Sequence, residues 1–158
     1  MVDTVRERIL QQWHKNLDSL QNQEASSDLF QLVSREPLDR SDFTGAVACA
    51  LIDEGEDVAV YETGYLQMDM IVSVEFWIRM KRGCVASTEL NEVAGLITRE
   101  FLGKINTDED VTNEQLSLNI QPQSLDFDID GVNDTFVAGV RSFRISYRHK
   151  KQDPYLLA

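Results

Sequence analysis

The stretch that most constrains the fold runs from Met68 to Lys81, where an apolar residue falls at every second position. Alternation over such a length is typical of a β-strand with one buried face. The opposite face is mainly polar but carries Ile71 and Trp77, which predicts that it is partly covered. Fully extended, the stretch would span about 46 Å, well beyond the usual strand of about 5 to 6 residues. We therefore expect a long strand that is either broken or projects from the body as an arm.

The length and composition of the chain favour one domain. Its 158 residues, 42% of them apolar, suffice for a single core but not for two. The net charge of −12 repels phosphate backbones and anionic membranes, which disfavours nucleic acid as the main partner. The chain has no apolar run of signal-peptide or membrane-spanning length. We expect a soluble protein made in the cytoplasm, one domain over residues 1–158, with residues 149–158 as a candidate extended tail.

The flanking segments predict two helices among further strands. Thr4 and Glu7 form a capping-box pattern for a helix that runs to about Gln23, and a second helix is expected from Thr88 to Lys104. The other alternating segments predict a strand at 29–33, a hairpin over 45–61, paired strands at 116–120 and 125–129, and a last strand at 135–147 with a bulge at Gly139. This order indicates an α+β fold with a mostly antiparallel sheet and the two amphipathic helices packed on it.

Charged residues gather in two kinds of segment. Four carboxylates between residues 53 and 57 would lie at the tip of the predicted hairpin, either as a solvated turn or as an acidic contact with a basic partner. Basic residues cluster at the end of the long strand and again in residues 135–158. This second segment contains five basic residues and a single acidic one, an aspartate. This last segment ends in Tyr155, Leu156 and Leu157. It is compatible with contact to a neighbouring subunit, with disorder, or with nucleic-acid binding.

No segment carries a complete catalytic or metal-binding motif. Asp126, Asp128, Asp130 and Gly131 match the start of an EF-hand calcium loop, but the twelfth position is Val137 rather than glutamate. These aspartates belong either to a solvated acidic strand, which we favour, or to a cation site. The two histidines, His14 and His149, are expected at the surface, and Cys49 and Cys84 are expected as buried, reduced thiols. We therefore expect no catalytic, cofactor or metal residue, and not an enzyme.

Five segments, taken in their order along the chain, resemble those of a known protein family. They are VRERILQQWHKNL, ALIDEGEDVAVYE, MIVSVEFWIRM, TELNEVAGLITREFL and VRSFRISYRH. In this order the sequence resembles the tail terminator proteins of long-tailed bacteriophages. The resemblance spans nearly the whole chain. It implies a homo-oligomeric ring, typically a hexamer, that caps the tail tube and ends its polymerisation.

The resemblance also implies a place and partners. The ring would lie at the head–tail junction of the virion, between the tail tube protein and a head completion or connector protein, and DNA would pass through its acidic lumen without specific binding. Edge strands such as 116–120 could pair across subunits. The candidate contact residues are Asp53, Glu54, Glu56, Asp57, Arg79, Lys81, Arg82, Arg144, Arg148, Tyr155, Leu156 and Leu157. The alternatives are another head–tail connector or tube protein, or a small-ligand-binding or enzymatic α+β domain.

Overall fold

The computed structural model describes residues 3–22, 27–39, 45–103, 107–108, 114–129 and 136–158. Within them the chain forms an α+β fold in which two helices pack on a six-stranded, mostly antiparallel sheet. In chain order the elements are α1 (Val5–Asp18), β1 (Leu32–Ser34), β2 (Val47–Tyr61), β3 (Tyr65–Arg79), α2 (Ala86–Gly103), β4 (Thr107–Asp108), β5 (Glu114–Gln115), β6 (Asn119–Asp128), β7 (Phe136–Lys150) and β8 (Asp153–Leu157).

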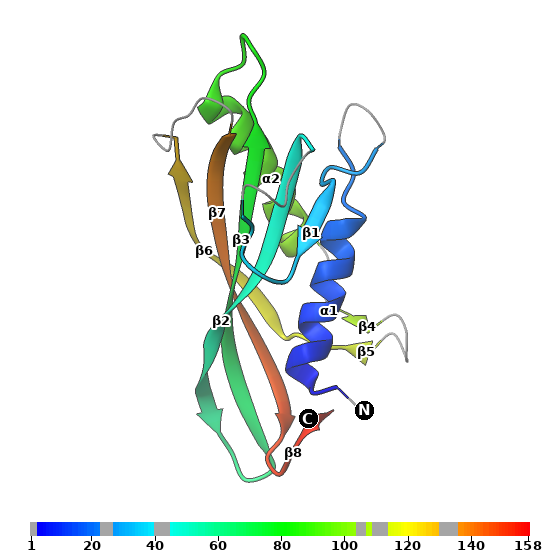
Figure 1. The fold of residues 1–158 in the computed structure, drawn as a ribbon. Helices are drawn as coiled ribbons and strands as arrows, with labels where there is room; N and C mark the ends of the chain where they lie inside the picture. Colours follow the sequence, from blue (N-terminus) through cyan, green and yellow to red (C-terminus); the bar gives the residue numbers. More distant parts are fainter. Residues whose placement is uncertain (1–2, 23–26, 40–44, 104–106, 109–113, 130–135) are drawn as a thin grey trace.

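The long alternating stretch is the unbroken central strand β3. The sheet has the order β1-β2-β3-β7-β6, with β8 paired to the end of β7, and only β1 joins in parallel. β3 pairs with β7 without a register shift from Tyr65↔Lys150 to Arg79↔Phe136. At one end, the β2–β3 turn and β8 extend beyond the N-terminal end of α1 (Figure 1). This end of the sheet therefore projects from the helix-packed body.

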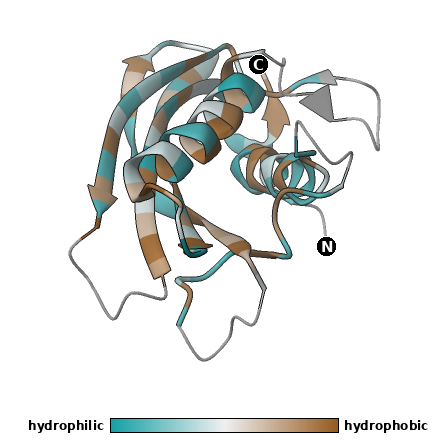
Figure 2. Ribbon diagram, turned by 90° about the horizontal axis from the view of Figure 1, so that it is seen from above, coloured by the Kyte–Doolittle hydropathy of each residue, from teal (hydrophilic) through white to brown (hydrophobic). Residues whose placement is uncertain are grey.

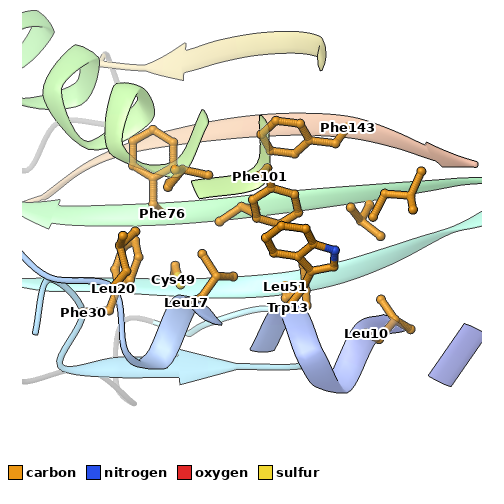
Figure 3. Close-up of a cluster of buried hydrophobic side chains, with 14 of the residues drawn as sticks. Leu10, Trp13, Leu17, Leu20, Phe30, Cys49, Leu51, Phe76, Phe101 and Phe143 are labelled. Atoms are coloured by element: carbon orange, nitrogen blue, oxygen red, sulfur yellow. The ribbon is translucent and has the colours of Figure 1, made fainter. Parts of the chain in front are cut away.

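Both helices pack against one face of the sheet (Figure 2). Thr4 caps α1 as predicted, because its hydroxyl accepts a hydrogen bond from the Glu7 amide at 3.2 Å. The helix ends at Asp18, earlier than the predicted Gln23, and its Trp13 stacks on Phe101 of α2 at a centroid distance of 3.9 Å. Phe101 in turn stacks on Phe143 of β7 at 4.2 Å (Figure 3). Three buried rings therefore join both helices to the sheet.

The two faces of β3 are covered to different degrees, as its sequence predicts. Met70, Val72, Val74 and Phe76 are completely buried under the helices. On the helix-free face Ser73 is buried, and its hydroxyl lies 2.9 Å from the hydroxyl of Ser142 on β7, while the other residues are half-buried.

Two predicted turns are instead parts of continuous strands. The acidic segment 53–57 lies inside β2, whose register shifts between Asp53 and Gly55 and again between Val58 and Val60. β1 pairs with β2 only over Ala48–Ala50, so the acidic segment has a strand on one side alone and its carboxylates can reach water. Likewise, the two strands expected at 116–129 are one strand, β6, with an irregularity between Pro122 and Ser124. Pro122 is tolerated because β6 pairs only with β7 and its other edge is unpaired in the described sheet.

Gly139 does not form the predicted bulge. Its pairing with Phe76 is regular, and its lack of a side chain instead lets the Phe76 ring lie directly over the backbone of β7. A Cβ atom at this position would lie 2.3 Å from Cζ of Phe76. The glycine is therefore required by the packing of the core rather than by a break in the strand.

We expect Gly139→Ala to destabilise the fold by about 1–3 kcal/mol, because the added methyl group must displace the Phe76 ring. Urea unfolding followed by tryptophan fluorescence measures the effect. Gly95→Ala on the exposed face of α2 is the matched control, since nothing lies within 4 Å of its added Cβ. It should be neutral or stabilise by up to about 1 kcal/mol. Equal unfolding curves for the two variants would contradict the packing argument.

Candidate assembly surfaces

The acidic residues of β2 divide into a pair bound within the subunit and a pair at the surface. Arg6 of α1 forms an ion pair with Asp53 and lies 3.5 Å from the Glu56 carboxylate. The buried hydroxyl of Tyr147 donates a hydrogen bond to Glu56 at 2.5 Å. Burial, followed by the adjacent Glu56, raises the pKa of the Tyr147 hydroxyl, which therefore stays protonated as a donor. This network ties α1 to the base of the projecting end, whereas Glu54 and Asp57 are exposed.

The predicted basic cluster at the end of β3 is also divided. Arg79 is fixed in the sheet, with its guanidinium 4.6 Å from the Phe136 ring centroid and its Nε donating to the Gly45 carbonyl at 3.2 Å. Lys81 and Arg82 are exposed in the turn that follows the strand. Arg79 is therefore engaged in contacts within the subunit, whereas Lys81 and Arg82 are open to a partner.

The C-terminal segment is ordered as part of the sheet. β7 continues to Lys150, beyond the predicted end at Tyr147, and β8 folds back on it as a hairpin. Leu157 packs against the core, while Tyr155 and Leu156 are 45% and 47% exposed. The structure thus favours a surface for contact over a disordered tail.

The end of this hairpin meets the β2–β3 turn, and we call residues 61–65 and 150–156 together the arm tip. Lys151 Nζ lies 4.1 Å from the centroid of the Tyr61 ring. Next to it, Arg148 lies over the Tyr65 ring at 4.6 Å and donates from Nε to Gln67 at 3.2 Å. Tyr61 is 67% exposed, so the arm tip presents cations together with large apolar surface.

A second surface lies toward the other end of the helix-free face, where β3, β7 and β6 run side by side. Cross-strand pairing places Glu75, Val140 and Asp126 in one row and Trp77, Ala138 and Asp128 in the next. Together with Phe136 they line a depression of about 370 Å³, which we call the acidic pocket. The rings of Trp77 and Phe136 meet edge to face at 6.3 Å, and the Trp77 indole donates to Glu75 at 2.9 Å. The pocket therefore combines an aromatic floor with carboxylates.

Strand edges are poorly suited to pairing across subunits. Leu116, at the start of the predicted edge strand, is buried, and the Leu118 amide already donates to the Ser146 carbonyl at 2.7 Å. The outer edge of β6 carries Pro122, and that of β2 is interrupted by its register shifts. Such features are typical of edges that do not add further strands. Side-chain surfaces are thus better candidates for assembly than the predicted strand 116–120.

The residues considered for chemistry take structural or surface positions. Asp126 and Asp128 are exposed on β6, Asp130 and Gly131 lie outside the described residues, and the part of the chain that the structure describes holds no group of residues suited to a metal ion. His14 is half-buried rather than at the surface, because its Nε2 donates to the Val33 carbonyl at 3.1 Å. Burial raises the pKa of the Cys49 thiol. Cys84 is exposed, contrary to expectation, since it lies in the turn before α2.

Only weak signals for the two surfaces are present in the amino-acid sequence. Trp77 on the polar face of β3 predicted that this face is partly covered, but not that Phe136 lies beside it. Tyr61 and Tyr65 of the arm tip are more than 80 positions from Arg148 and Lys151, so only the strand register brings them together.

Among the described helices, none is both long enough and apolar enough to cross a lipid bilayer. No protein-family model matches the chain, and no curated protein matches its sequence significantly.

We expect Tyr147→Phe to destabilise the subunit by about 1–2 kcal/mol, because Glu56 loses a buried donor. Tyr155→Phe is the control, since it removes the same hydroxyl from an exposed ring and should change stability by less than about 0.5 kcal/mol. Urea unfolding of both variants makes the comparison. If both variants lost the same free energy of unfolding, the Tyr147–Glu56 hydrogen bond would contribute no more to stability than an exposed hydroxyl group does.

Proposed function

We propose that this chain is a structural subunit of a bacteriophage virion, a tail terminator that assembles into a ring in the host cytoplasm. The ring caps the tail tube, stops its growth and forms the tail side of the head–tail junction. Its partners are further copies of the chain, the tail tube protein and a head completion or connector protein.

The observation that carries the proposal is the projecting end of the sheet. The ends of β2, β3, β7 and β8 extend past the helices there, and their side chains include Val58, Tyr61 and Leu156, which are 53%, 67% and 47% exposed. Large apolar side chains clustered on a projection are typical of an interaction surface rather than of an isolated monomer. The order of helices and strands also agrees with the order on which the resemblance to tail terminators rests.

The charge of the chain agrees with a channel for DNA. A subunit with a net charge of −12 gives a ring that repels phosphate groups, so DNA can move through the lumen without being retained. Subunits that share this charge also repel one another, so a stable ring requires contacts that are complementary at close range.

The proposal is tested with the purified full-length protein and isolated tail tubes. We expect light scattering to give the mass of a closed oligomer, and electron microscopy to show an added ring at one end of the tubes. Tubes capped in this way should stop growing when free tube protein is added. Lengthening of the tubes by the protein itself would instead identify a tube subunit. A protein that stays monomeric and leaves the tubes unchanged would contradict the proposal.

A further inference from the structure

We propose that the arm tip of one subunit docks into the acidic pocket of a second copy of this chain, and that this contact joins neighbours in the ring. The inference rests on the proposed function, because it names the contact that the ring would use. A second copy is the occupant that the charges of the two surfaces, their apolar residues and the distance between them favour.

The cations at one surface and the carboxylates at the other are opposite in charge. The arm tip carries Lys150 and Lys151, with Arg148 directly behind them on β7. The acidic pocket carries Glu75, Asp126 and Asp128. Lysine side chains entering the pocket would exchange the repulsion among these carboxylates for attraction, which favours correct association.

The apolar parts of the two surfaces also correspond. The arm tip projects from the body of the subunit and exposes Tyr61, Tyr155 and Leu156. The acidic pocket is concave, and Trp77, Phe136 and Val140 give it apolar walls. A contact with an aromatic and aliphatic centre and charges at its rim has the usual composition of a protein–protein interface.

A subunit cannot fill its own pocket. Both surfaces lie on β7, the pocket at residues 136–140 and the arm tip from Lys150 onward. Ten residues of extended strand separate Val140 from Lys150, which corresponds to roughly 33 Å. Because β7 runs between the two surfaces as one continuous strand paired with β3 from Phe136 to Lys150, the occupant must come from another molecule. A contact between two different patches of the same chain is heterologous, the type that produces rings.

A nucleic acid is a less suitable partner for the arm tip. Glu62 and Asp153 balance the two lysines of the arm tip, and the remaining chain is strongly acidic. One face of the Tyr61 ring and one face of the Tyr65 ring are already covered by Lys151 and Arg148. With its positive charge balanced and two of its ring faces covered, the arm tip lacks the extended positive groove that single strands require.

The test exchanges the charges of the two surfaces in the full-length protein. Lys150→Glu with Lys151→Glu reverses the arm tip, and Asp126→Lys with Asp128→Lys reverses the pocket. We expect each double variant to weaken self-association at least about tenfold, measured by light scattering over a concentration series. The quadruple variant, in which both surfaces are reversed, should regain the mass of the wild type. An equimolar mixture of the two double variants should regain it as well.

The control reverses two cations on the helical side, by Lys15→Glu with Arg99→Glu, and changes the net charge by the same amount as the arm-tip variant. It should assemble nearly as the wild type does. Circular dichroism and thermal unfolding at low concentration show whether each variant is folded, and a pocket variant that failed to fold would be replaced by Ser124→Arg with Gln121→Arg on the same face of β6. Rescue by the opposite reversal cannot arise from nucleic acid or from misfolding.

The outcomes separate this inference from the proposed function. A closed oligomer that is insensitive to both reversals, or that the quadruple variant fails to restore, would overturn the docking of the arm tip but leave the terminator proposal standing. Assembly that follows the charge exchange but leaves tail tubes uncapped would overturn the terminator proposal alone. A wild-type protein that remains monomeric both in solution and on tubes would overturn both.

Discussion

The fold depends on the stacking of three buried aromatic rings, Trp13, Phe101 and Phe143, which come from α1, α2 and β7. Each stacked pair contributes about 0.5–1.5 kcal/mol beyond the burial of its apolar area. The indole N–H of Trp13 has no hydrogen-bond partner among the described residues, so stacking and burial must outweigh the loss of its hydration. The stack therefore determines which face of the sheet the helices cover, and leaves the opposite face available for other contacts.

The length of β3 follows from this one-sided arrangement. Its middle lies under the helices, where core packing stabilises it, and its Tyr65 end extends beyond them with only strands for neighbours. The network of Arg6, Asp53, Glu56 and Tyr147 lies where the covered part gives way to the projecting part. It restrains the base of the projection against α1, so that the arm tip is held as a continuation of the sheet rather than as a free loop.

Alternation in the sequence was sufficient to predict β3 and its two faces, because these depend on local periodicity. The errors have one physical origin. The charges at 53–57, Pro122 and Gly139 are local signals for turns or bulges, but pairing with β3 and β7 keeps each of them within a strand. The acidic pocket and the arm tip escaped prediction for a related reason. Their members come from strands distant in sequence, and the register that aligns them is set by the whole sheet.

Charge is distributed unevenly between the two ends of the helix-free face. A chain with 27 acidic and 15 basic residues repels its own copies. A stable contact between two copies must therefore place cations of one copy next to carboxylates of the other. On the helix-free face the cations lie along the later half of β7, at Arg144, Arg148 and Lys150, while Asp126 and Asp128 face its earlier half. Two copies related by a simple translation or rotation along this face bring unlike ends together. Because screening in physiological salt limits such attraction to about 8 Å, the apolar side chains at both ends must provide the close fit that lets the charges act.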